Sequence, residues 1–266
     1  MRTCSLLCAW CTFTGNVSKN SAAPGVGNGG AVWSPEPNVA ADAELASVCF
    51  SGCRFICNTN EASNGGGVFR NIGAVLVKAE RGTFIGNASV SYGNVYNFGS
   101  GTAGAHGGLV MTDCVVSGNV SVVSGEGDEY NRFGTITSVA DSGTFSLMRC
   151  RFIENIDVGG AGAVFVATPF AKVENCEFRS NRSMRCGFSA ATLAFEPTAT
   201  NAIVRGCLFA DNKCRCRRQV CTVQSGCVAI RRRNELRRRE LHVRGQSGVA
   251  AVIDFGCKVC RCGECR

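Results

Sequence analysis

Short apolar runs alternate with glycine, asparagine and charged residues along most of the chain. Three of these runs are Ala74-Val-Leu-Val77, Thr144-Phe-Ser-Leu147 and Ala202-Ile-Val204. Runs of this length between turn-forming residues are typical of β-strands, and no helical period competes with them. None approaches the roughly 20 apolar residues that a membrane-spanning helix requires. The pattern therefore predicts an all-β chain of short strands with no membrane span.

A motif of the form Cys/Gly-x-Phe-x-x-Asn follows many of these runs. The seven copies are Cys11-Thr-Phe13-Thr-Gly-Asn16, Cys53-Arg-Phe55-Ile-Cys-Asn58, Gly82-Thr-Phe84-Ile-Gly-Asn87, Cys114-Val-Val116-Ser-Gly-Asn119, Cys150-Arg-Phe152-Ile-Glu-Asn155, Cys176-Glu-Phe178-Arg-Ser-Asn181 and Cys207-Leu-Phe209-Ala-Asp-Asn212. Successive asparagines are 26 to 42 residues apart, a spacing that falls among solenoid repeats. We expect each copy to mark one coil of a repeat structure, with loops of variable length between the coils.

A glycine-rich step into a short apolar run follows most copies of the motif. The examples are Gly29-Gly-Ala-Val32, Gly65-Gly-Gly-Val68, Gly107-Gly-Leu-Val110, Gly162-Ala-Val-Phe165 and the more degraded Ser225-Gly-Cys-Val228. We interpret each step as the start of a further strand of its coil. Glycine suits places where coils crowd together or where the backbone needs positive φ, an interpretation that we favour over phosphate binding.

Stacking of equivalent residues about 4.8 Å apart, as in hydrogen-bonded strands, gives the motif a physical meaning. The Cys and Phe positions are two residues apart, so both face the same side of a strand, and we expect both to be interior. We place the asparagine at the turn, because it tolerates left-handed backbone conformations and because stacked amides can satisfy one another. The predicted ladder residues are Phe13, Phe55, Phe84, Phe152, Phe178 and Phe209, interrupted by Val116, and Asn16, Asn58, Asn87, Asn119, Asn155, Asn181 and Asn212. Buried free thiols are predicted at Cys53, Cys114, Cys150, Cys176 and Cys207.

These features predict a right-handed parallel β-helix, or solenoid, of about seven irregular coils. The hand follows the general preference of parallel crossover connections. We assign residues 1–212 to the solenoid and residues 213–266 to a basic, cysteine-rich tail that is either a degenerate last coil or disordered. Ser5-Leu6-Leu7 is interpreted as an ordinary repeat strand rather than part of a signal peptide. We therefore expect a solenoid truncated at its start, with coils of a longer parent protein as one of its neighbours.

The pairing of F-x-x-N with G-G-A-[I/L/V] resembles the repeat signature of the chlamydial polymorphic outer membrane proteins. The resemblance covers about residues 11–212. It implies a surface-exposed or secreted passenger that acts in adhesion and is exported as an autotransporter. The expected location is the cell surface, which is the outer membrane in a bacterium, or the extracellular space. The partners that it implies are proteins or glycans on a host or neighbouring cell.

The alternative function is a carbohydrate-active enzyme, because pectin-degrading lyases and hydrolases resemble this architecture. Their sites need paired carboxylates, or calcium with a basic group, on one outer face. Acidic residues are scattered in this chain, and we assign the one tight group, Glu126, Asp128 and Glu129, to a solvated loop. His106 is the only histidine before the tail. We therefore predict no catalytic residue, and a non-enzymatic protein without a cofactor is the favoured interpretation.

The tail differs from the rest of the chain in charge and in cysteine content. It holds 14 of the 28 Lys and Arg residues against four acidic ones, whereas acids slightly outnumber bases before it. Cys257, Cys260, Cys262 and Cys265 are candidate zinc ligands, although the separated second pair of a typical zinc module is missing. The arginine triplets at 231–233 and 237–239 are not interleaved with aromatics, which argues against nucleic-acid binding. A frayed or mistranslated end, or a degenerate last coil, is the favoured interpretation.

Four of the motif asparagines, Asn16, Asn87, Asn119 and Asn181, also begin an N-x-S sequence. Such a sequence marks glycosylation sites on the surface of secreted eukaryotic proteins. If the amides are stacked inside the solenoid, a glycan on one of them would block the neighbouring coil. We therefore predict that Asn87, Asn119 and Asn181 stay unmodified in the folded protein.

Overall fold

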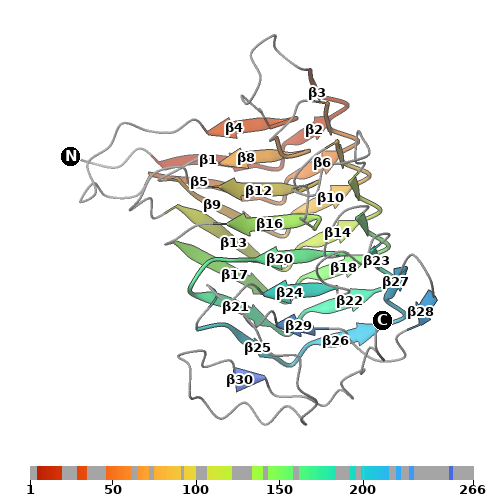
Figure 1. Ribbon diagram of the computed structural model, residues 1–266. Helices are drawn as coiled ribbons and strands as arrows, with labels where there is room; N and C mark the ends of the chain where they lie inside the picture. The colour runs from red at the N-terminus through yellow and green to blue at the C-terminus, as the bar shows by residue number, and fades with distance from the viewer. Residues whose placement is uncertain are drawn as a thin grey trace.

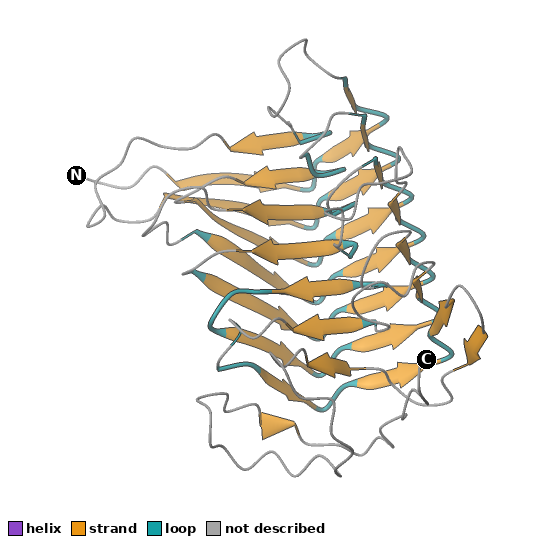
Figure 2. Ribbon diagram, viewed as in Figure 1, coloured by secondary structure: helices purple, strands orange, loops and turns teal. Residues whose placement is uncertain are grey.

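The computed structural model is an elongated stack of short strands, with no helix in the part of the chain that it describes (Figures 1 and 2). The structure describes residues 5–19, 29–34, 46–61, 65–71, 75–90, 93–99, 107–121, 134–139, 143–157, 162–183, 192–195, 199, 201–215, 220–222, 228–230 and 252–253. The strands form four sheets, named A to D here, whose strands follow one another along the stack.

Sheets A and B contain the strands on either side of the motif cysteine. Sheet A consists of β1 (Ser5–Ala9), β5 (Ala46–Ser51), β9 (Val75–Glu80), β13 (Gly108–Thr112), β17 (Thr144–Met148), β21 (Ala171–Glu174), β25 (Ile203–Arg205) and β30 (Val252–Ile253). Sheet B consists of β2 (Thr12–Thr14), β6 (Arg54–Ile56), β10 (Thr83–Ile85), β14 (Val115–Ser117), β18 (Arg151–Ile153), β22 (Glu177–Arg179) and β26 (Leu208–Ala210).

Sheets C and D contain the strands that follow the motif asparagine. Sheet C consists of β3 (Val17–Ser18), β7 (Thr59–Asn60), β11 (Ala88–Ser89), β15 (Val120–Ser121), β19 (Ile156–Asp157), β23 (Arg182–Ser183), β27 (Lys213–Arg215) and β28 (Val220–Thr222). Sheet D consists of β4 (Val32–Ser34), β8 (Phe69–Asn71), β12 (Tyr96–Gly99), β16 (Ile136–Val139), β20 (Val164–Val166), β24 (Leu193–Phe195) and β29 (Val228–Ile230).

The chain passes through sheets A, B, C and D in turn and then returns to sheet A for the next coil. Strands of successive coils pair in parallel, as β10 does with β6 and β14, and only β27 and β28 pair antiparallel among the described strands. This is the topology of a parallel β-helix, so the predicted solenoid is confirmed, while its right hand stays a prediction. The short strands of sheet C were not predicted from the sequence.

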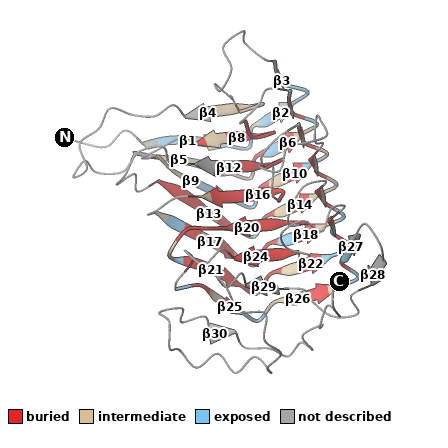
Figure 3. Ribbon diagram, viewed as in Figure 1, coloured by how far each residue is buried: buried red, intermediate tan, exposed pale blue. Residues whose placement is uncertain are grey.

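The phenylalanine column predicted from the motif lies on the face of sheet B that points into the core of the solenoid. All seven copies occupy successive strands in one register, in which Phe55 pairs with Phe84 and Phe84 with Val116. The Phe13 and Phe55 rings stack with their centroids 4.7 Å apart, and the Phe152 and Phe178 rings are 4.9 Å apart. Offset ring stacking at these separations stabilises beyond the area that it buries. Figure 3 shows the buried interior of the middle coils.

Two bends of each coil hold one residue in the left-handed conformation. The first precedes the motif cysteine and is formed by Trp10, Gly52, Arg81, Asp113, Arg149, Asn175 and Gly206. The second directly precedes the motif asparagine and is formed by Gly15, Cys57, Gly86, Gly118, Glu154, Ser180 and Asp211. The sequence interpretation that placed the left-handed backbone at the asparagine itself is therefore wrong by one residue.

The glycine step has a steric rather than a conformational origin. A Cβ atom on Gly30 would lie 2.1 Å from the Gly67 carbonyl oxygen, and one on Gly67 would lie 2.0 Å from the Asn94 oxygen. One example differs from the others, because Gly108 begins β13 of sheet A, whereas the other steps lead into sheet D strands. The sheet D strands of that region are β12 and β16. Residues 107–110 have the same local sequence pattern as the glycine steps of sheet D. Only their short distance from Cys114 distinguishes them from those steps.

Strands also occur after residue 212, within the region assigned to the tail. β27 continues sheet C beside β23, β29 continues sheet D beside β24, and β30 pairs with β25 of sheet A. Ser225-Gly-Cys-Val228, noted above as a degraded glycine step, thus leads into a sheet D strand.

Candidate functional site

The motif asparagines form a continuous hydrogen-bonded ladder from Asn16 to Asn212. In the middle of it, the Asn119 Oδ1 atom accepts bonds from the backbone N and the Nδ2 of Asn87, both 2.9 Å long. The Asn119 Nδ2 atom donates to Asn155 Oδ1 at 2.9 Å and to the Phe84 carbonyl at 3.1 Å. The amide thus uses both of its donors and accepts twice, while it is fully buried. The predicted amide ladder is present, and each bond between two asparagines is donated by the earlier coil to the later one.

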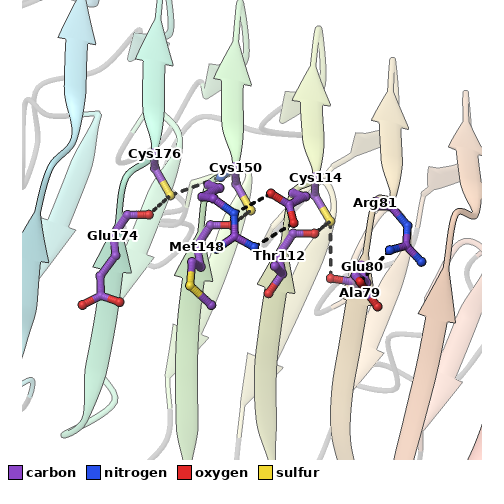
Figure 4. Close-up of polar contacts among 11 residues, drawn as sticks. Ala79, Glu80, Arg81, Thr112, Cys114, Met148, Cys150, Glu174 and Cys176 are labelled. Atoms are coloured by element: carbon purple, nitrogen blue, oxygen red, sulfur yellow. Dashed lines mark hydrogen bonds and ion pairs between the residues drawn. The ribbon is translucent and has the colours of Figure 1, made fainter.

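The motif cysteines form a second interior column beside sheets A and B (Figure 4). Cys114, Cys150 and Cys176 are buried free thiols, and each Sγ donates to a carbonyl two residues before it. Cys53 is also a buried free thiol, and Cys207 is a half-buried one. The hydrogen bond with Cys150, together with burial, raises the pKa of the Cys114 thiol. Such thiols pack as small apolar groups and react slowly.

The interior columns therefore explain the motif without assigning it a ligand. Asn87, Asn119 and Asn181 are buried and bonded to neighbouring coils, so a glycan has no room there. A functional surface must be sought among side chains that point outward.

The strongest outward feature is a group of cations over the bend between sheets A and B, which we call the cationic strip. It comprises Arg149, Arg151, Lys172, Arg179 and Arg205, together with the carboxylates of Asp113, Glu174 and Glu177. The cations come from β18, β21, β22, β25 and the bend after β17, so neighbouring coils contribute them. Their side chains are each about half exposed.

Two carboxylates hold four of these cations in place. Glu174 lies between Lys172, 3.0 Å away in the same strand, and Arg205 of the next coil. Only 6% of the Glu174 side chain is exposed, and Figure 4 shows it pointing away from Cys176. Because each carboxylate sits beneath two cations, the outer layer of the strip keeps unused N–H donors that face solvent.

Glu177 is held between two arginines in the same way. It receives Arg151 of the preceding coil at 3.1 Å and Arg179 of its own strand at 2.8 Å. Asp113 accepts a bidentate pair of bonds from Arg149 of the next coil, at 2.7 and 2.8 Å. A bidentate guanidinium–carboxylate pair fixes the plane as well as the position of the arginine.

The pKa values of Asp113 and Glu177 fit carboxylates that stay charged beside their arginines. The hydrogen bond from Arg149 lowers the pKa of the Asp113 carboxyl, and that from Arg179, with Arg151, lowers the pKa of the Glu177 carboxyl. The general acid of a glycoside hydrolase requires the opposite, a carboxyl with a raised pKa. Asp113 and Glu177 are therefore suited to holding cations rather than to donating protons.

Other candidates named from the sequence lie outside the described residues. These are the zinc candidates Cys257, Cys260, Cys262 and Cys265, the acidic group Glu126, Asp128 and Glu129, His106, and the arginines at 231–233 and 237–239. Among the described residues, no three His, Cys, Asp or Glu side chains gather as a metal would require. Nor does this part of the chain contain a helix of the length and apolar character that crossing a membrane demands.

Sequence reasoning missed the cationic strip, because its members are spread over some 90 residues and the charge of the whole region is nearly balanced. The signal that would have found it is the motif register, which places Arg151 beside Glu177 and Glu174 beside Arg205.

Comparison of the chain with models of protein families, with characterised proteins and with solved structures finds no match.

Proposed function

We propose that this protein is a non-enzymatic surface or secreted β-helix scaffold, adhesin-like in its role, whose cationic strip binds acidic glycans at a cell surface. The observation that carries the proposal is the arrangement of Glu174 and Glu177, each of which anchors two half-exposed cations from neighbouring strands. The F-x-x-N repeat, through its resemblance to a family of surface passengers, supports the adhesive role and the location.

The geometry of the cationic strip favours a linear polyanion. Successive coils repeat at about 4.8 Å, so cations on adjacent coils follow one another at a spacing comparable to the length of a sugar ring. Over sheets A and B and their shared bend, cations outnumber carboxylates two to one in the described residues. The cations are Arg54, Lys78, Arg81, Arg149, Arg151, Lys172, Arg179 and Arg205, and the carboxylates are Glu80, Asp113, Glu174 and Glu177.

A glycan is favoured over a nucleic acid by what surrounds the cations. Single-stranded nucleic acid is usually held by bases stacked on aromatic side chains beside the basic groups. The described outward neighbours in sheet B include Val115, Ile153 and Leu208 instead, and the exposed Phe170, two residues before Lys172, is a lone aromatic rather than one of a series. Carboxylate or sulfate groups of a sugar chain need only the charged donors.

Binding of the whole chain to heparin, polygalacturonate, neutral dextran and single-stranded DNA, at low and at physiological salt, tests the proposal. We expect binding to the two acidic glycans that weakens with salt, and a loss of about tenfold in the double variant Arg151→Ala, Arg179→Ala. The control is the double variant Lys19→Ala, Arg182→Ala, which removes the same charge from exposed positions elsewhere. Equal losses in both variants, binding to dextran, or preference for DNA would contradict the proposal.

A further inference from the structure

An exposed phenylalanine, Phe170, lies on the outer face of sheet A next to the cationic strip. It directly precedes β21, and 63% of the residue is exposed to solvent. Singly exposed apolar residues are common on protein surfaces, so exposure alone assigns no role to the ring. What distinguishes Phe170 is its surroundings, which combine cations, a fixed backbone and polar neighbours.

The ring and the nearest cations share one face of the sheet. Residues two apart in a strand point to the same side, and Ala171, between Phe170 and Lys172, is buried. Two residues of strand span about 7 Å. The half-exposed Lys172 ammonium group contacts Glu174 at 3.0 Å and keeps further N–H donors for a ligand. Glu174 follows on the same face and holds Arg205 of the next coil.

The backbone that carries Phe170 is bonded to two other coils. Four residues join β20 to β21, Phe170 is the last of them, and Figure 2 shows this connection as a short loop at the left of the stack. The Ala167 backbone N donates to the Ser138 carbonyl of the preceding coil at 2.7 Å. The Asn201 backbone N of the next coil donates to the Pro169 carbonyl at 2.9 Å. A ring on such a support needs little ordering when a ligand binds.

Polar residues lie on either side of the ring in the neighbouring coils. The backbone bond of Asn201 to this connection places Asn201 beside Phe170 in the next coil. The pairing of Phe145 with Ala171 places Thr144 beside Phe170 in the preceding coil. Thr144 and Asn201 are both exposed, and hydroxyl and amide groups both donate to and accept from sugar hydroxyls. The exposed ring therefore lies between two side chains of the kind that binds sugars.

We propose that Phe170 is a specificity-determining residue of the glycan site, which selects chains that contain uronic acid units over polyanions without sugar rings. The C–H groups on one face of a pyranose would stack on the Phe170 ring, while the carboxylate of that unit or the next binds Lys172 and Arg205. A uronic acid suits this site because its carboxylate is attached directly to the ring, which keeps the charge close to the apolar face. The inference rests on the proposed binding of acidic glycans by the cationic strip, and it identifies the uncharged part of the ligand that the protein recognises.

Titration of the whole chain with polygalacturonate and with inorganic polyphosphate, over a series of salt concentrations, tests the inference. We expect Phe170→Ala to weaken polygalacturonate binding about tenfold and to leave polyphosphate binding unchanged, because only the sugar chain has an apolar face to stack on the ring. The slope of log Kd against log salt concentration should stay the same in Phe170→Ala, since no ion pair with the ligand is lost. Lys172→Ala should reduce this slope for both ligands, because fewer counterions are released on binding.

Two further variants serve as controls, and circular dichroism verifies that all variants are folded. Phe170→Trp keeps an aromatic face and should retain polygalacturonate binding. Val17→Ala shortens another exposed apolar side chain, in sheet C, and should bind both ligands like the parent chain. Equal losses for both ligands in Phe170→Ala, or unchanged polygalacturonate binding, would overturn this inference alone and leave the cationic strip as a site for polyanions. A parent chain that binds neither ligand would overturn the proposed function and this inference together.

Discussion

Asn119 illustrates how one polar side chain stabilises an interior that is otherwise apolar. Its amide forms four hydrogen bonds to residues of the coils before and after it, and none of the atoms involved reaches solvent. Burial of an amide is unfavourable unless its groups are bonded, and here every group is. Loss of the Asn119 side chain therefore destabilises the protein mainly because it leaves buried groups of the neighbouring coils without a hydrogen-bond partner.

We predict that Asn119→Ala lowers the free energy of unfolding by about 3 kcal/mol, because buried groups of Asn87, Asn155 and Phe84 lose their partner. Asn16→Ala should cost about 1 kcal/mol, since Asn16 is exposed and bonds to one coil only. Urea unfolding followed by circular dichroism measures both. Equal losses would show that the interior of the ladder is no different from its exposed end.

At the scale of the strand and its bends, the chain uses two different constraints that both select glycine. Gly118 occupies a left-handed bend with φ of +61°, yet an added Cβ would meet nothing within 4 Å. Gly67 has no positive φ, yet its added Cβ would collide with a backbone oxygen of the next coil. The first is a constraint of conformation, and the second is a constraint of space between coils.

These two glycines give a matched pair of substitutions. Gly118→Ala should destabilise by about 1 kcal/mol, the cost of a left-handed residue with a side chain. Gly67→Ala should destabilise by about 3 kcal/mol, because backbone of adjacent coils has to move apart. The urea midpoints of the two variants measure these losses, provided that the dependence of the unfolding free energy on urea is unchanged. A smaller loss for Gly67→Ala than for Gly118→Ala would mean that the coils are not so closely packed at the glycine step.

Positions where the same residue type recurs in each coil could be predicted from the sequence. Positions where only the backbone conformation recurs, with a different residue type in each coil, could not. The Phe and Asn columns were found because the same residue recurs at the same place. The second left-handed bend was assigned to the wrong residue, because it is filled by types as different as Gly118, Glu154 and Ser180. The two-residue strands of sheet C, such as Ala88–Ser89, are too short to show any alternation.

At the scale of the whole molecule, the register of the strands places residues that are distant in the sequence side by side. Arg151 and Arg179 are distant in the chain, but both form an ion pair with Glu177. The local sequence around each residue does not predict this contact. The same register aligns thiols from many coils into one column, inside a protein that we propose to act at a cell surface, where oxidising conditions favour disulfides. Burial keeps these thiols apart from such chemistry.

We predict that Cys114, Cys150 and Cys176 stay unpaired and label slowly with maleimide in the folded protein, whereas the exposed Cys57 labels rapidly. The physical reasons are burial and, for Cys114 and Cys176, a pKa raised by bonds to neighbouring thiols and by burial, which depletes the reactive thiolate. Peptide mapping by mass spectrometry, with a denatured sample as control, gives the order in which the cysteines are labelled. Rapid labelling of Cys114 would place the column at the surface.

The uniform direction of the asparagine ladder has an electrical consequence. Each side-chain carbonyl accepts from the preceding coil, and one N–H of each amide donates to the asparagine of the next coil, so the amide dipoles add instead of cancelling. Oriented side-chain amides act as fixed partial charges, and bonds in such a chain polarise one another. The solenoid thus carries a side-chain counterpart of the helix macrodipole, with its negative pole at Asn16 and its positive pole at Asn212, which makes its two ends electrostatically different.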